Sequence, residues 1–508
     1  MSLAKKYTQQ TRNENGGIGF GMVQLGPHFD KRLVQIFAPE RPLVLAMTAG
    51  DYMLLFFFFV VAVAAQENIP VDGDKTLQFV QVIWRHGDRS PTTTCGTDQF
   101  QEETWTFGGG GWGQLSPIGM QQHVSLGNKL RQRYIDTKFL AENYRADEVY
   151  FRSTDVNRTL LSAVSNTIGM YGQGSAVKGV WGNIPDFGPD VNYTWPAFFI
   201  PIPIHTTYNP TDYYGNPDAD CPRQTALWQT AQTTPEISKL LNDDNTKKVF
   251  SILAEKCGKQ YKLEDLWEVI DAFFIERVYN LSNPAWMDDD LFNNVFNLNN
   301  IAQDFVNGIG VSALNGVDIS TETRRIRSGA MFNLFNDQIK QKRDCVTSNG
   351  TKCSHWLKNL KYFVYSAHDT TVYAYLTALN SEKLVIKDGG YPHYSAAVLT
   401  EYWRDTAGKD YVKFVYHNGY QDGFTVFTDQ VPICNGSHIY CPLENYSQHA
   451  ADLSFAKWGS PEKMCADVSF ASSASSTPKV EATTTKAAQK ALGIVGLVLT
   501  LISMVRLL

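Results

Sequence analysis

The sequence predicts an α/β protein with a mixed central sheet, helices on both faces of that sheet, and an inserted, mostly helical cap domain. Three runs rich in valine, isoleucine and aromatic residues, which favour strands, each end in charged residues. Helical patterns directly follow two of these runs and also dominate the middle of the chain. We therefore assign residues 66–172 and 356–470 to the sheet domain and residues 173–355 to the cap domain.

The first strand passes into a basic turn within Leu77–Arg89. Its first half reads Leu-Gln-Phe-Val-Gln-Val-Ile-Trp, and Arg-His-Gly-Asp-Arg follows. Ligands of open α/β sheets bind at the carboxyl ends of strands. We therefore expect Arg85, His86 and Arg89 to form one wall of a phosphate site, with Asp88 as a structural residue. A helix capped by Ser116 should follow.

Two more strands end in charged residues. The strand Glu148–Arg152 precedes a helix that extends to about Tyr171. The run Lys361–Asp369 ends in His368 and Asp369 and precedes a helix over 370–379. Two antiparallel strands are then expected at 396–403 and 410–417.

The cap is predicted from periodic apolar residues. The helical patterns cover 228–241, 264–279 and 291–307, and a fourth begins near Ser320 and passes Phe335. Three aspartates at 288–290 resemble a metal site, but they precede a helix, where a solvated first turn is the better interpretation.

The three charged strand ends predict one anion site. The carboxyl ends of parallel strands lie at the same edge of a sheet, and helix N-termini there add backbone donors. Arginines to hold phosphoryl oxygens, a nucleophilic imidazole and a carboxylic acid for the leaving oxygen are what phosphoryl transfer to a side chain needs.

Four motifs resemble those of the histidine acid phosphatases and occur in the same order, at residues 85–91, 113–123, 152–155 and 366–369. The resemblance implies a secreted or membrane-associated acid phosphatase that hydrolyses phosphomonoesters with neither metal nor other cofactor. It implies that His86 forms a phosphohistidine and that Asp369 protonates the leaving oxygen. The residues that would hold the phosphoryl oxygens are Arg85, Arg89, Arg152 and His368. Family members often form dimers, so a homodimer is among the implied partners.

Two other functions stay open. One is a selective phosphatase of the same superfamily, acting on inositol phosphates or lysophosphatidate. The other is an inactive surface protein that binds phosphorylated ligands, although the retained His86 and Asp369 argue against it. A formal charge of −6 over 508 residues argues against a nucleic-acid partner.

Both ends of the chain carry apolar segments that bear on location. Residues 53–63 are apolar and run into small residues suited to signal-peptidase cleavage near Ala64 or Ala65. Either Met47 or Met53 is the initiator of a signal peptide, or the segment is an internal signal anchor. After a polar linker at 471–490, the apolar tail at 491–508 is either a lipid-anchor signal or a single-pass membrane anchor.

Cysteines and glycosylation sequons fit the secretory pathway. The eight cysteines are an even number and predict disulfides, with Cys345 and Cys353 close enough to form a local loop. The family resemblance implies the pairs Cys221–Cys465 and Cys434–Cys441, and it leaves Cys257 without its usual partner, for which Cys95 is the candidate. The expected glycosylation sites are Asn192, Asn280, Asn349, Asn435 and Asn445. Asn157 is excluded as too close to the site.

Overall fold

The computed structural model describes residues 71–470, except 173–177, 180–181, 188–194, 387–389, 435 and 437–438. The predicted signal segment, polar linker, C-terminal tail and the sequons at Asn192 and Asn435 lie outside the described residues. Within the described part, none of the helices combines the length and the apolar character needed to cross a bilayer.

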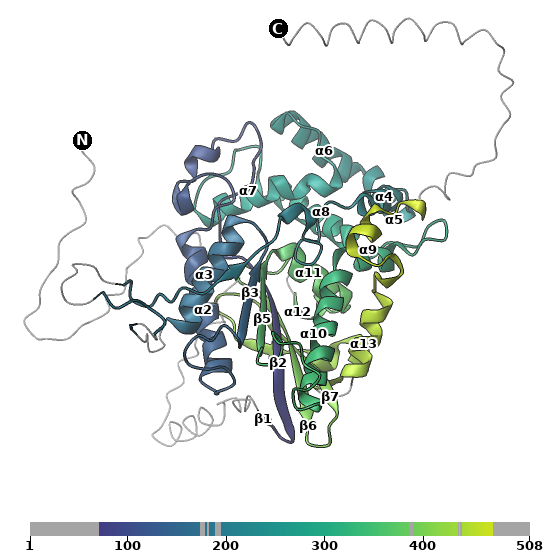
Figure 1. The fold of residues 1–508 in the computed structure, drawn as a ribbon. Coiled ribbons are helices and arrows are strands. Elements are labelled where there is room, and N and C mark those ends of the chain that lie inside the picture. The colour runs from purple at the N-terminus through teal and green to yellow at the C-terminus, as the bar shows by residue number, and fades with distance from the viewer. Residues whose placement is uncertain are drawn as a thin grey trace, which may run out of the picture. The chain divides into compact units, whose positions relative to one another are not determined.

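The sheet is mixed and has the strand order β4-β3-β5-β2-β6-β7-β8 (Figure 1). Strand β2 (Lys75–Arg85) lies parallel to β5 (Tyr362–Ala367), which lies parallel to β3 (Val149–Ser153). On its other side, β2 pairs antiparallel with β6 (Ala397–Asp405). The remaining strands are β1 (Val71–Asp72), β4 (Ile204–His205), β7 (Asp410–His417), β8 (Phe424–Val426) and β9 (Cys441–Pro442). The predicted fold class and the predicted strands are therefore confirmed.

Strand β2 is buried on both faces, which explains its apolar sequence. Phe79 and Ile83 belong to the core on one face, and Val82 and Trp84 belong to the core on the other. Leu77 belongs with Val82 and Trp84 because the pairing with β6 shifts register between Leu77 and Phe79. Packing on both faces therefore holds the strand in place up to its carboxyl end, where the charged residues begin.

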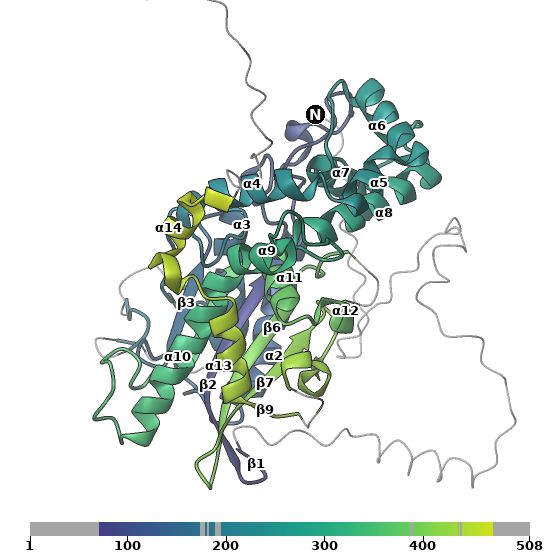
Figure 2. The ribbon, with the colours of Figure 1, turned by 90° about the vertical axis from the view of Figure 1, so that its right-hand side faces the viewer.

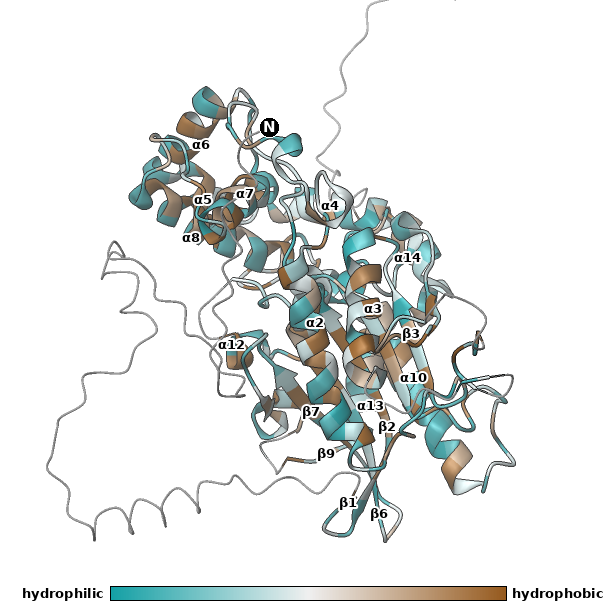
Figure 3. Ribbon diagram, turned by 90° about the vertical axis from the view of Figure 1, so that its left-hand side faces the viewer, coloured by the Kyte–Doolittle hydropathy of each residue, from teal (hydrophilic) through white to brown (hydrophobic). Residues whose placement is uncertain are grey.

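Helices cover both faces of the sheet, as predicted. The first face carries α2 (Pro117–Leu130), extended by a π-helical turn at Arg131–Ile135, and α3 (Asn157–Tyr171), whose apolar residues appear brown in Figure 3. The other face carries α10 (Gly329–Thr347), α11 (Asp369–Ala378) and α13 (Leu443–Asp452). Figure 2 shows α10 and α13 side by side on that face.

The remaining long helices pack around a separate apolar core. They are α4 (Pro222–Ala231), α5 (Pro235–Asn242), α6 (Asp244–Cys257), α7 (Leu266–Val278), α8 (Asp289–Val306) and α9 (Ile319–Arg327). Two short helices, α12 (Glu382–Val385) and α14 (Pro461–Ala466), complete the fold. Asp288 caps α8 by accepting a hydrogen bond from the Leu291 amide, which agrees with a helix start rather than a metal site.

Three helix predictions need correction. The helix expected over 228–241 is two helices, because Pro235 has no N–H to continue the first. The helix expected from Ser320 through Phe335 is also two, since the chain bends at Ser328. Helix α10 packs on the sheet, so the separately packed helical segment ends at Arg327 and not at residue 355.

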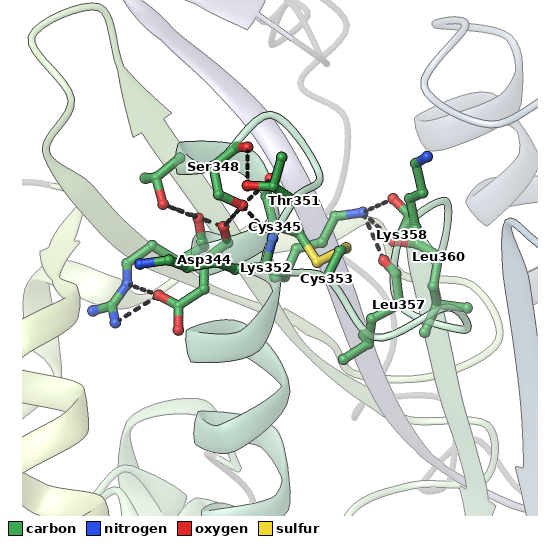
Figure 4. Close-up of a disulfide and its surroundings, with 12 residues drawn as sticks. Asp344, Cys345, Ser348, Thr351, Lys352, Cys353, Leu357, Lys358 and Leu360 are labelled. Atoms are coloured by element: carbon green, nitrogen blue, oxygen red, sulfur yellow. Dashed lines mark hydrogen bonds and ion pairs between the residues drawn. A yellow bond between two sulfur atoms is a disulfide. The ribbon is translucent and has the colours of Figure 1, made fainter.

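All eight cysteines form disulfides: Cys95–Cys257, Cys221–Cys465, Cys345–Cys353 and Cys434–Cys441. Figure 4 shows Cys345–Cys353 closing the turn after α10. Nearby, the ammonium group of Lys342 donates to the carbonyls of Leu357, Lys358 and Leu360, at 3.3, 3.2 and 2.7 Å. Burial lowers the pKa of Lys342 to about 8. These contacts order the chain that enters β5 and so help to place the site residues at its far end.

Candidate active site

The carboxyl ends of β2 and β5 bring five of the predicted residues together. Arg85 ends β2, and its Nη2 lies 2.9 Å from Oδ2 of Asp369, the first residue of α11. The rings of His86 and His368 lie edge to face, with centroids 5.6 Å apart. Arg89 is close enough for its charge to lower the pKa of both histidines. Parallel pairing of Arg85 with Ala367 produces this convergence.

The turn after β2 is held rigidly by backbone contacts. The His86 amide donates to the Ala367 carbonyl at 3.0 Å, and the His86 carbonyl accepts from the Ser395 amide at 3.1 Å. A Cβ at Gly87 would lie 2.3 Å from the Gly119 carbonyl oxygen, so only glycine fits where α2 meets the turn. The backbone of His86 is therefore held by β5, by Ser395 and by the close approach of the turn to α2.

The hydrogen bonds of His86 define which nitrogen can react. Its Nδ1 lies 2.8 Å from the carbonyl oxygen of Gly87. A carbonyl can only accept, so Nδ1 carries the proton and the lone pair remains on Nε2. Burial, together with the charges of Arg158, Arg89 and Arg85, holds the pKa of His86 well below its usual value. This environment favours the neutral imidazole, with its lone pair on Nε2.

The structure gives Arg152 a different environment from the one predicted. Its Nη2 lies 3.7 Å from Oδ1 of Asp212, and its guanidinium lies 5.3 Å from the centre of the Tyr365 ring. None of its described interactions involves the five residues brought together at the strand ends. The geometry does not bring Arg152 into the group with His86.

Arg158, in the first turn of α3, takes the place expected for Arg152. Its Nη2 lies 3.4 Å from Nδ1 of His368, and its charge is the largest electrostatic contribution to the low pKa of His86. Burial beside Arg89 lowers the pKa of Arg158 to about 9. Arg158 is thus the third arginine around His86.

The pKa of the acid candidate Asp369 is lowered in the free site, which favours its carboxylate form. Burial alone would raise its pKa, but the charges of Arg85, Arg89 and His368 lower it overall. His368 precedes it and has its own pKa lowered to about 3 by burial and by Arg158. Nε2 of His368 lies 3.0 Å from the Thr154 hydroxyl. The site thus combines two histidines of lowered pKa with the Asp369 carboxylate beside Arg85.

Besides Arg158, two residues of the site were not predicted from the sequence. Asp271, in the middle of α7, binds Arg89 through two hydrogen bonds of 2.8 and 3.0 Å. The ring of Tyr394 lies 4.2 Å from the guanidinium carbon of Arg85. Neither residue stands at a strand end or in a recognisable motif, so the sequence offered no signal for them.

Asp88 has the structural role that was expected. Its Oδ2 accepts hydrogen bonds of 2.5 Å from the hydroxyls of both Ser116 and Tyr279. Ser116 caps α2, and Tyr279 follows α7. Asp88 therefore joins the basic turn to one helix of each core.

The charge pattern suits an oxyanion. Arg85, Arg89 and Arg158 surround His86, and the Nε atom of each arginine is buried with no acceptor among the described residues. Buried donors without an acceptor are costly, and phosphoryl oxygens would satisfy them. The described residues contain no group of three or more histidine, cysteine or acidic side chains arranged to hold a metal ion.

Known proteins resemble this chain over most of its length. A family model for the histidine phosphatase superfamily (branch 2) matches residues 76–417. Putative acid phosphatase 10 of Caenorhabditis elegans is 31% identical over 79% of this chain and 96% of its own length. The lysosomal acid phosphatase of Xenopus laevis is 31% identical over 79% of this chain and 82% of its own length. The prostatic acid phosphatase of Homo sapiens is 30% identical over 80% of this chain and 92% of its own length. The chain belongs to branch 2 of the histidine phosphatase superfamily.

Proposed function

We propose that this protein is an acid phosphatase that hydrolyses phosphomonoesters through a phosphohistidine on His86. The observation that carries the proposal is the free Nε2 lone pair of His86, surrounded by Arg85, Arg89 and Arg158. A neutral imidazole inside a ring of cations suits attack on a dianionic phosphoryl group. The acid phosphatases among the relatives support the same reaction.

The reaction proceeds in two steps. The three arginines and His368 hold the phosphoryl oxygens, and Nε2 of His86 attacks phosphorus as the bond to the ester oxygen breaks. Asp369 gives its proton to the departing oxygen, which leaves as an alcohol. Water then attacks the phosphohistidine, Asp369 takes a proton back, and inorganic phosphate leaves with His86 restored.

Acidic conditions favour the protonated Asp369 that the first step needs, while the lowered pKa of His86 opposes protonation of its imidazole. The low pKa of His86 keeps its lone pair available in acid. Asp369 must be protonated, although nearby positive charges lower its pKa in the free site. A bound phosphate dianion neutralises Arg85 and Arg89 and adds negative charge, which raises the pKa of Asp369. Activity is therefore expected to fall as the pH rises through that pKa in the substrate complex.

Asp369→Asn tests this assignment, because the amide keeps the shape of the side chain but cannot donate the required proton. We expect kcat to fall about 10²- to 10⁴-fold with alkyl phosphates, whose leaving groups need protonation. With p-nitrophenyl phosphate, whose leaving group departs as an anion, we expect a loss of about tenfold or less. Steady-state kinetics with both substrates at several pH values measure the difference. Equal losses would contradict the acid role.

Exposed sequons support glycosylation at Asn280 and Asn349, which both lie on the surface at positive φ. Asn445 is less suited, because its amide nitrogen donates to the Ile433 carbonyl at 2.9 Å. With four disulfides, these sites support a secretory-pathway protein, either lysosomal or secreted. A homodimer is part of the same proposal.

We propose further that the segment at 491–508 directs attachment of a lipid anchor. Small residues, a polar spacer and a terminal apolar stretch carry this proposal. Phosphatidylinositol-specific phospholipase C should then release phosphatase activity from washed membranes, as measured in the supernatant after centrifugation. Activity that stays in the pellet until detergent is added would instead indicate a membrane-spanning tail.

A further inference from the structure

One face of α7 is apolar and yet exposed. Trp267, Phe274 and Val278 are 40%, 43% and 49% exposed, whereas most other apolar residues of the helix are buried. At 100° per residue, these three side chains and Asp271 project within a sector of about 60°. Ile270 and Ile275 lie on either side of this sector and are buried. The exposed strip is therefore narrow and bordered by packed surfaces.

The strip lies next to the phosphate-binding residues. Asp271 belongs to it and contacts Arg89 through both carboxylate oxygens. Trp267 and Phe274 are four residues before and three residues after Asp271, so they are its direct neighbours on the helix surface. In Figures 1 and 2, α7 lies beyond the ends of β2 and β5 that carry the site. An ester group bound to the held phosphoryl group and directed toward α7 would meet these two aromatic side chains.

We infer that the Trp267 and Phe274 face of α7 receives the leaving group, and that the enzyme favours phosphomonoesters with an apolar leaving group such as an alkyl chain. This inference rests on the proposed function, because only a bound phosphomonoester fixes one end of the ligand at Arg89. Covering exposed aromatic surface with methylene groups is favourable in proportion to the apolar area removed from water.

A series of n-alkyl phosphates from ethyl to octyl, used below their micelle concentrations, tests the inference. Beyond ethyl, the leaving-group chemistry changes little, so differences in kcat/KM report contacts with the chain. We expect kcat/KM of the full-length protein to rise by about tenfold or more from ethyl to octyl phosphate. In the double variant Trp267→Ser, Phe274→Ser, the octyl-to-ethyl ratio should fall to about a third of the wild-type ratio or less.

Trp356→Ser is the matched control. Trp356 is 46% exposed and contacts Tyr150, near the opposite end of β3 from the site, so its variant should keep the wild-type ratio. A flat series in the wild type, or a double variant with an unchanged ratio, would overturn the inference. A double variant that shifts from dimer to monomer in light scattering and keeps its ratio would assign the strip to self-association instead. Failure of the wild type to hydrolyse any member of the series would count against the proposed function itself.

Discussion

His86→Ala is expected to reduce phosphatase turnover by about 10⁴-fold or more, since in the proposed mechanism it removes the atom that bonds to phosphorus. The surrounding arginines remain, so substrate can still bind, but no covalent intermediate can form. Turnover of p-nitrophenyl phosphate near pH 5 measures the loss. In parallel, acid-labile radiolabel on the protein after rapid mixing with labelled substrate should appear in the wild type and be absent from the variant.

His355→Ala is a suitable control, because this histidine is exposed and lies in the loop before β5, away from the site. It should keep both the turnover and the labelling of the wild type. Circular dichroism and a melting curve establish that the His86 variant is folded. Folded His86→Ala protein with activity within tenfold of the wild type would disprove the nucleophile assignment.

Arg158→Ala is expected to lower kcat/KM by about 10²- to 10³-fold, because its guanidinium, 3.4 Å from His368, would stabilise charge on the transferring phosphoryl group. Arg152→Ala provides the comparison, since the two arginines are six residues apart and only Arg158 approaches the histidines. The loss for Arg152→Ala should be at least about tenfold smaller, with its effect mainly on stability.

The two variants need one further measurement each. Arg152 pairs with the buried Asp212, so the melting temperature of the Arg152→Ala protein should fall more than that of the Arg158→Ala protein. Competitive inhibition by inorganic phosphate should weaken strongly in Arg158→Ala and little in Arg152→Ala. The reverse order of phosphate affinities would restore the original prediction for Arg152.

The contrast between these arginines explains what the sequence could predict about the site. Parallel pairing brings strand ends to one edge whatever their separation in sequence, so Arg85, His86, His368 and Asp369 could be grouped in advance. Arg152, however, pairs with Tyr365, two residues before the Ala367 that pairs with Arg85, and its guanidinium lies beside Asp212 and Tyr365. The third arginine instead comes from the helix that follows the strand.

The site residue from the cap could not be predicted from the sequence for another reason. Asp271 meets Arg89 across 182 positions of sequence, and no local pattern encodes which helix face meets the site. The same limit applies to α10, whose apolar periodicity is equally compatible with packing on the sheet or within the cap. The strands and most helices were predictable because their patterns depend on near neighbours alone.

The central position of β2 also has a consequence for biosynthesis. Its Trp84 pairs with Ser366, 282 residues further along the chain. At ribosomal elongation rates, roughly 15 to 60 s separate the synthesis of these two partners. During that interval β2 lacks both β5 and β6, so its apolar side chains have no sheet to join. The candidate site can assemble only after β5 and Asp369 have been synthesised, so phosphatase activity reports a chain that has passed residue 369.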